Sequence, residues 1–71
     1  MRLSRMFHVM RYAGFLDQGV TVGVFGTRPE AESAAHQAAS EFQSSGFDHE
    51  QGYWWGRNDG EVTIRFLVVA K

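Results

Sequence analysis

The sequence contains no cysteine and only one proline, and none of its apolar runs is long enough to span a bilayer. Without cysteine there is no disulfide framework, no thiolate nucleophile and no cysteine-based zinc site. An excess of charge of one sign is also missing, because seven lysines and arginines stand against eight aspartates and glutamates for a net charge of -1. A strong duplex-binding protein is expected to carry a basic excess that neutralises several phosphates. The composition therefore excludes a disulfide-stapled domain and argues against a strong duplex binder.

The N-terminal segment does not have the pattern of an export signal. Arg2 and Arg5 precede the first apolar residues, but His8 and Arg11 interrupt them, so the continuous apolar part of a signal peptide is missing. We therefore expect a soluble, cytoplasmic protein that does not associate with membranes.

What the sequence does contain is enough apolar material for one small core. Hydrophobic residues make up 44% of the 71 residues, and the aromatic residues are six phenylalanines, two tyrosines and two tryptophans. Residues 1–71 are therefore expected to form a single small domain. A domain of this size buries only about 60% of the surface of its unfolded chain, so its core is thin. Because no disulfide reinforces this core, self-association as a homodimer is an open alternative.

Hydrophobic periodicity predicts two strands, a helix and two further strands. Residues 6–12 form a short apolar segment, and residues 20–25 alternate valines with other residues at the period of two that is typical of a half-buried strand. Residues 53–57 and 61–70 flank the sequence NDG, in which Gly60 suits a backbone of positive φ, so they are expected to form a hairpin. Residues 47–52 are expected to form an acidic loop.

The helix is predicted from its first turn onward. Thr27 and Glu30 have the spacing of a capping box, and Pro29 falls in the first turn, where its missing N–H is harmless. Gly46 is expected to terminate the helix. The apolar side of the helix consists mostly of small residues: Ala31, Ala34, Ala35, Ala38 and Phe42. An alanine face lets a helix approach a sheet closely, so the bulky core residues must come from the sheet.

The order ββαββ predicts an α+β fold: a four-stranded, mainly antiparallel sheet with one helix packed on one face. The sequence leaves open whether the first strand pairs with the second strand, with the last strand, or with both.

Two adjacent tryptophans must point to opposite faces of the strand at 53–57. The core face of the last strand is expected to carry Val62, Ile64, Phe66 and Val68. If Arg57 and Glu61 close the hairpin as a pair, Trp54 lies opposite Ile64 and belongs to the core as well. Trp55 and Tyr53 then lie opposite Thr63 and Arg65, on the face away from the helix. The six residues expected on that face form the candidate partner-binding site: Tyr53, Trp55, Arg57, Arg65, Leu67 and Val69. The alternatives are that the strand register is off by one residue, which would bury Trp55, or that the N-terminal residues or the loop at 13–19 fold over this face.

Nothing in the sequence indicates an enzyme, a cofactor or a metal site. His8, His36 and His49 are scattered over a strand, a helix and a loop, without a short metal-ligand spacing. A histidine partner for a nucleophilic serine is not evident, and a domain of this size has little room for a water-excluded pocket. Catalytic, cofactor-binding and metal-binding residues are therefore predicted to be absent.

Two functions would use the candidate face. In the first, it docks on a protein partner or on a second copy of the chain, as in a small adaptor or a stoichiometric inhibitor, such as bacterial or phage-encoded regulators. In the second, the aromatic residues stack on the bases of a single-stranded nucleic acid while Arg57 and Arg65 meet phosphates. The apolar neighbours Leu67 and Val69 and the weak net charge favour the protein partner.

Overall fold

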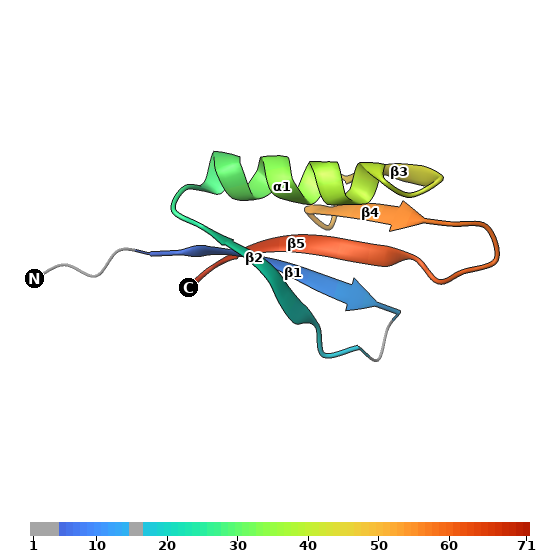
Figure 1. Cartoon of the computed structure of the whole chain (residues 1–71), viewed down its shortest axis with the longest axis horizontal. Helices are drawn as coiled ribbons and strands as arrows, with labels where there is room; N and C mark the ends of the chain where they lie inside the picture. The colour runs from blue at the N-terminus through green and yellow to red at the C-terminus, as the bar shows by residue number, and fades with distance from the viewer. Residues whose placement is uncertain (1–4, 15–16) are drawn as a thin grey trace, which may run out of the picture.

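A computed structural model describes residues 5–14 and 17–71, and over these ranges the chain forms one helix and a five-stranded antiparallel sheet (Figure 1). The strands are β1 (Phe7–Ala13), β2 (Val20–Phe25), β3 (Ser44–Asp48), β4 (Tyr53–Arg57) and β5 (Ile64–Ala70). The helix α1 (Arg28–Ser40) lies on one face of the sheet. The strand order is β2-β1-β5-β4-β3, so β2 and β3 are the edges. The predicted α+β class with one helix on one face is confirmed.

The predicted four-stranded ββαββ order is wrong, because the chain forms an additional strand between the helix and the last hairpin. We expected the helix to continue to Gly46 and an acidic loop to follow, whereas α1 ends at Ser40 and residues Ser44–Asp48 form β3. Two serines and a glycine give this segment little intrinsic preference for a strand. It becomes extended because it pairs with β4 over its whole length, from Ser44 opposite Arg57 to Asp48 opposite Tyr53.

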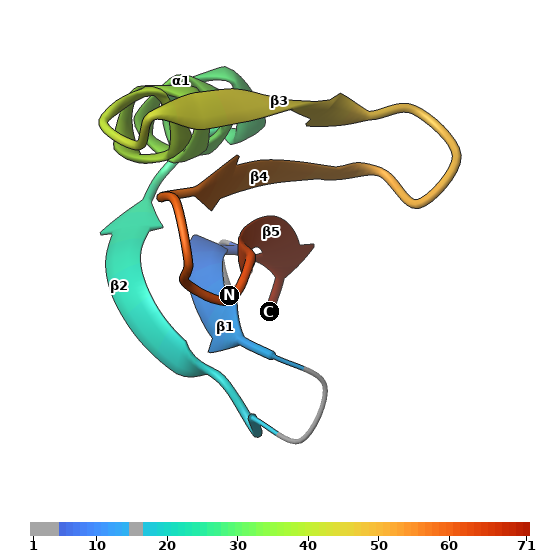
Figure 2. The same cartoon turned by 90° about the vertical axis from the view of Figure 1, so that its right-hand side faces the viewer.

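The first strand pairs with both of its candidate neighbours. Its register with β2 begins at Phe7 opposite Phe25, and its register with β5 begins at Phe7 opposite Ala70. Figure 2 shows the resulting sheet as a strongly curved surface, with α1 beside β3 and β4 and with β2 at the other edge. This placement leaves the face of the sheet opposite α1 without a covering helix in the described part of the chain.

The helix begins as its sequence predicts. The Thr27 hydroxyl accepts a hydrogen bond from the Glu30 backbone N–H at 3.4 Å and donates one to Glu30 Oε1 at 2.8 Å. Pro29 lies in the first turn. The helix buries small residues against the sheet, with Ala31, Ala35 and Ala39 completely inaccessible to solvent. The spacing of four residues between them places all three on one helical face.

Close approach of the helix to the sheet is the main feature of the core. Gly56 of β4 is buried, and a Cβ at this position would lie 2.9 Å from the Ala39 carbonyl oxygen and would overlap the Phe42 ring. The larger core residues come from the central strands, namely Val9 of β1 and Ile64 and Phe66 of β5. The expectation of an alanine face on the helix and bulky residues on the sheet is confirmed.

The β4–β5 pairing exists, but its register differs by two residues from the expected one. Trp54 lies opposite Phe66, and Trp55 lies opposite Arg65. The two strands are joined by residues 58–63 rather than by a tight turn closed by Arg57 and Glu61, because β5 starts only at Ile64. The first residue of this connection binds the turn between α1 and β3 instead, as the Asn58 Oδ1 accepts the Gln43 backbone N–H at 2.9 Å. Val62, expected in the core, is therefore 60% exposed.

A shift of two residues keeps every side chain on its expected face, because side chains alternate with a period of two. Trp54 consequently packs against the core from the helix side, as expected. Its indole Nε1 donates a hydrogen bond to Glu32 Oε1 at 3.0 Å, and its ring stacks on His36 with 4.3 Å between the ring centroids.

Candidate functional site

The face of the sheet opposite α1 carries the residues that the sequence placed there. We call this surface the outer face. The strand registers place Trp55 beside Arg65, Leu67 beside Met10, and Val69 beside His8. The residues of the outer face come from three neighbouring strands: Tyr53, Trp55 and Arg57 of β4, Arg65, Leu67 and Val69 of β5, and Met10 and Tyr12 of β1. Arg57 is exposed, and the others are half-buried.

Arg65, near the start of β5, is held on the outer face by two tyrosine rings and a carbonyl group. Its guanidinium carbon lies 5.3 Å from the centroid of the Tyr12 ring and 5.7 Å from that of Tyr53. The guanidinium also donates a hydrogen bond to the Gly14 carbonyl oxygen at 3.0 Å. Cation–π contacts of this kind contribute about 0.5–1 kcal/mol each at exposed sites. These contacts hold Arg65 in place and connect β1, β4 and β5 across the face.

Trp55 rests on a glycine of the edge strand β3. Gly46 lies opposite Trp55 in the β3–β4 register, and a Cβ at Gly46 would lie 3.1 Å from the indole Nε1 and Cζ2 atoms. A larger residue at this position would compete with the indole for the same space. The glycine therefore allows the ring to extend across the strand, which widens the aromatic part of the outer face.

A hollow lies beside Arg65, where the outer face meets the connection between β4 and β5. Its volume is about 450 Å³, and it is lined by Gly14, Tyr53, Arg57, Glu61, Val62, Thr63 and Arg65. The lining combines a tyrosine, an exposed valine and two arginines with one carboxylate. A partner side chain that enters this hollow would thus meet an aromatic wall and a positive charge.

Asp17 connects the end of β1 to the residues that precede β2. Its carboxylate accepts hydrogen bonds from the Ala13 and Gly19 backbone N–H groups, at 2.7 and 2.9 Å. These bonds, first that of Gly19 and then that of Ala13, lower the pKa of the Asp17 carboxyl from its ordinary value, and the positive charges of Arg11 and Arg65 lower it further. The ionised carboxylate thereby fixes the end of β1, where Gly14 meets Arg65.

Two segments were expected to be able to cover the outer face. Residues 1–4 and 15–16, which belong to these segments, lie outside the described residues. Within residues 5–14 and 17–71, no helix or further strand lies over the outer face, and the described part of the loop contributes the Gly14 carbonyl at its rim.

The edge strand β2 exposes three valines, which do not share one face as their spacing of two predicts. Val20, Val22 and Val24 are 55%, 51% and 48% exposed, whereas the apolar residues of the outer face on β1, β4 and β5 are half-buried. Val24 lies opposite His8, on the side of the outer face, and Val22 lies on the helix side beside Gly23. A β-bulge breaks the pairing with β1 between Val9 and Met10, so Val22 has no partner on β1, and an edge position leaves the strand open on its other side.

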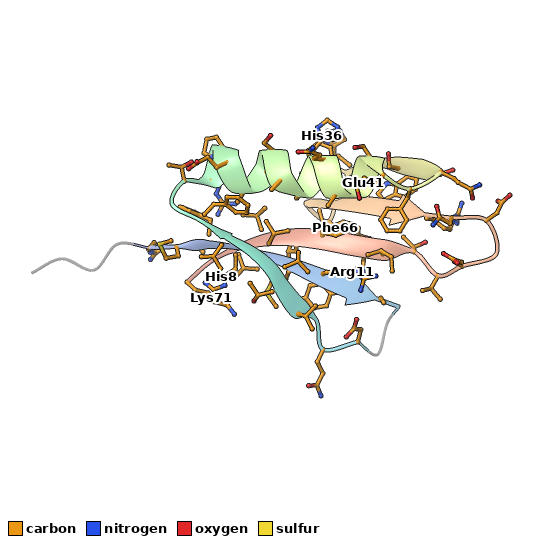
Figure 3. All side chains as sticks on the ribbon, viewed as in Figure 1. His8, Arg11, His36, Glu41, Phe66 and Lys71 are labelled. Atoms are coloured by element: carbon orange, nitrogen blue, oxygen red, sulfur yellow. The ribbon has the colours of Figure 1, made fainter. Side chains whose placement is uncertain are left out.

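Histidines and carboxylates do not gather into a metal-binding group within the described ranges. Figure 3 shows His36 on the helix, far from His8 on β1. His49 follows β3 and packs edge-on against Phe47, with 5.0 Å between the ring centroids. In the part of the chain that the structure describes, no helix is both long and apolar enough to cross a membrane.

Comparison with known proteins yields no relative on which to base a function. No family model, no curated protein and no solved structure matches the chain.

Proposed function

We propose that this chain is a non-enzymatic protein-binding module that docks on a larger protein through the outer face. The observation that carries this proposal is the arrangement of Arg65 between the Tyr12 and Tyr53 rings on a face that α1 leaves uncovered. Tyrosine, tryptophan and arginine are the residue types that contribute most to protein–protein hot spots. An arginine already held in place loses less conformational freedom when a partner binds, which favours affinity.

The composition of the outer face indicates the chemistry of the partner. Aromatic and aliphatic side chains lie along β4, β5 and β1, while the exposed Arg57 stands at one end beside the hollow. Interfaces of this kind have an apolar centre and a polar rim. The partner that fits is a protein surface with an apolar centre and an acidic group near Arg57.

The same residues are less suited to single-stranded nucleic acid. Base stacking requires free aromatic faces, but one face of each tyrosine ring is taken by the Arg65 guanidinium. Arg65 also donates to the Gly14 carbonyl, which leaves Arg57 as the better placed arginine for a phosphate. The net charge of -1 provides little long-range attraction to a polyanion.

The experiment that tests the proposal is a comparative affinity capture from an extract of the native cells. The immobilised wild-type chain is compared with Trp55→Ala and with Gln37→Ala, whose residue is exposed on the helix. We expect a protein that the wild type and Gln37→Ala retain and that Trp55→Ala loses. Retention of the same proteins by all three chains would contradict the proposed face.

A second measurement separates a protein partner from nucleic acid. A mixed-sequence single-stranded oligonucleotide is titrated at low and at physiological salt while tryptophan fluorescence is followed. We expect no saturable change. Saturable quenching that weakens with salt and disappears in Arg57→Glu would overturn the proposal in favour of nucleic-acid binding.

A further inference from the structure

The edge strand β2 lacks most of the features that normally prevent an exposed edge from pairing with another chain. The six residues of β2 include neither a charged residue nor a proline. Its sequence is dominated by Val20, Val22 and Val24, whose side chains are about half exposed. Natural edge strands are usually protected by lysine, proline, a β-bulge, short length or a covering segment. The bulge at Val22 is the one such feature that β2 has within the described residues.

The opposite edge of the sheet is different. The edge strand β3 is only five residues long and begins with two exposed serines. It ends at Asp48, whose Oδ1 accepts hydrogen bonds from the Glu50 and Gln51 backbone N–H groups, both at 3.0 Å. A short polar strand that ends in a carboxylate is a poor template for pairing. The two edges are therefore not equivalent, and β2 is the one open to association.

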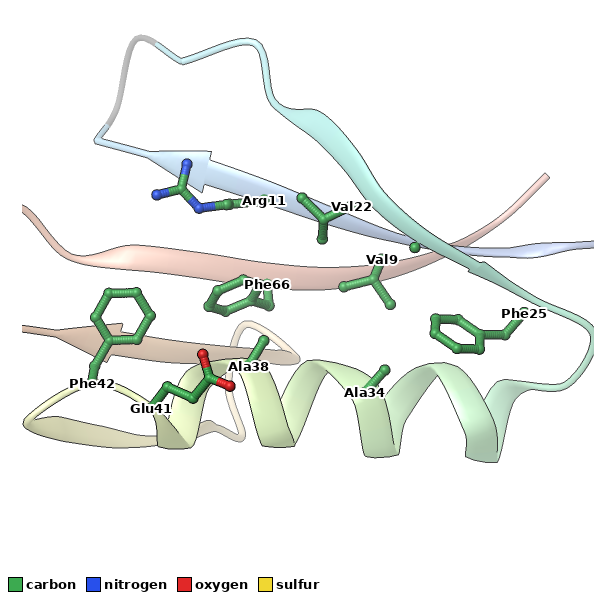
Figure 4. Close-up of a pocket in the computed structure, with 10 residues that line it drawn as sticks. Val9, Arg11, Val22, Phe25, Ala34, Ala38, Glu41, Phe42 and Phe66 are labelled. Carbon is green, nitrogen blue, oxygen red and sulfur yellow. The ribbon is translucent and has the colours of Figure 1, made fainter.

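An apolar groove runs between β2 and the helix (Figure 4). Its volume is about 320 Å³, and Val22 points into it from the sheet while Ala34 and Ala38 line it from α1. At one end lie Arg11 and Glu41, whose charges are opposite. The groove thus offers an apolar surface without net charge, which complements an uncharged apolar strand better than a charged peptide.

We propose that β2 is a homodimerisation strand, on which β2 of a second copy of this chain pairs antiparallel about a two-fold axis. The strand itself matches the apolar groove, because it is extended, uncharged and rich in valine. Pairing with an identical strand brings no like charges together and satisfies both free edges at once. Valine side chains on the helix side of each β2 then extend the apolar lining of the groove.

The length of β2 sets the strength of this association. Six residues of strand and a shallow groove provide less contact than the ~800 Å² per partner of a standard interface. The dimer is therefore weak, with a dissociation constant in the micromolar to millimolar range. The free edge of β2 is not part of the surface formed by Trp55, Arg65 and Tyr53 on β4 and β5, so the inference does not depend on the proposed function.

The test is sedimentation velocity of the full chain from micromolar to millimolar concentration. The wild type is expected to shift reversibly from monomer to dimer. Val22→Lys is expected to weaken dimerisation roughly a hundredfold, since the symmetric interface loses an apolar contact twice and gains two facing charges. Val62→Lys is the matched control, because Val62 is similarly exposed but lies outside β2. It is expected to leave dimerisation unchanged, and a wild type that remains monomeric at the highest concentration would overturn the inference.

Hydrogen exchange of the wild type supplies a readout that needs no variant. Backbone amides of β2 are expected to gain protection as the concentration rises, while those of β3 do not. Trp55→Ala is expected to dimerise like the wild type. If dimerisation instead persisted in Val22→Lys and was lost in Trp55→Ala, the second copy would occupy the outer face, and the inference about β2 would be wrong.

Discussion

Gly46 lies directly beside the indole of Trp55, since a Cβ at Gly46 would be 3.1 Å from the indole Nε1 atom. The glycine makes room for the aromatic part of the outer face. Gly46→Val should therefore displace Trp55 without unfolding the protein, because Gly46 belongs to an edge strand. We expect a shift of the Trp55 emission in a Trp54→Phe background, where Trp55 is the remaining tryptophan, and a loss of partner binding. Gly26→Val, with no atom within 4 Å of its Cβ, should change neither.

The two tryptophans should differ in their contributions to stability. Trp54 packs on the core, stacks on His36 and binds Glu32, so Trp54→Ala is expected to lower the free energy of unfolding by about 3 kcal/mol. Trp55 lies on the outer face, and Trp55→Ala should cost about 1 kcal/mol. Chemical denaturation measures both values. A larger loss of stability for Trp55→Ala than for Trp54→Ala would contradict the assignment of Trp54 as the core tryptophan.

Glu32 should contribute to the position of Trp54. Its carboxylate accepts the indole N–H at 3.0 Å, and its Oε2 also lies 3.5 Å from Arg28. Glu32→Ala is expected to cost about 1 kcal/mol, mostly through the hydrogen bond, because an exposed ion pair within a helix contributes little. Arg28→Ala removes the ion pair but keeps the hydrogen bond between Glu32 and Trp54. Because the Arg28 guanidinium carbon also lies 5.2 Å from the centroid of the Phe7 ring, this variant should cost about 0.5–1 kcal/mol in the same denaturation experiment.

Gly56 should tolerate no side chain. An added Cβ would lie 2.9 Å from the backbone oxygen of Ala39 and would overlap Phe42, so the helix would have to move away from β4. Gly56→Ala is expected to cost about 1–3 kcal/mol in denaturation experiments, as overpacked core substitutions do. Gly26→Ala is the control, because its Cβ would meet open space. Equal stability of the two variants would contradict the close packing of α1 on the sheet.

The Asp17 carboxylate should make the stability depend on pH. Hydrogen bonds from Gly19 and Ala13 lower the pKa of this carboxyl in the folded protein below its value in the unfolded chain. Its contribution to stability is therefore complete above about pH 4 and is lost as the pH falls through the folded-state pKa. Asp17→Asn should lower the Tm at neutral pH and converge with the wild type in acid. Gln18→Ala, a change at the exposed and uncharged neighbour of Asp17, should show the same dependence of Tm on pH as the wild type.

The features that the sequence predicted correctly are those fixed by local chemistry and by periodicity. The start of the helix follows from Thr27, Pro29 and Glu30, and the alternation of Trp54 and Trp55 follows from the geometry of a strand. The face of each tryptophan was predictable even though the register was not. A register error of an even number of residues leaves the faces unchanged.

The features that could not be predicted from the sequence depend on which strands pair in the folded protein. The segment Ser44–Asp48 has no strand pattern of its own and becomes β3 because β4 pairs with it. The exposure of Val20, Val22 and Val24 depends on the place of β2 at the edge of the sheet, which only the strand order determines. Arg65 was expected on the outer face, but its position between Tyr12 and Tyr53 requires β1 beside β5, a pairing that the sequence left open.

The measurement that tests the central claim most directly is the affinity of the captured partner for three forms of the chain, determined by calorimetric titration. Leu67→Asp places a charge in the apolar centre of the outer face, and Gln37→Asp places the same charge on the exposed side of the helix. We predict binding at least about tenfold weaker for Leu67→Asp, because an unpaired charge must lose water at the interface, and no change for Gln37→Asp. Equal affinity of Leu67→Asp and the wild type, with both chains folded, would contradict the assignment of the outer face as the docking surface.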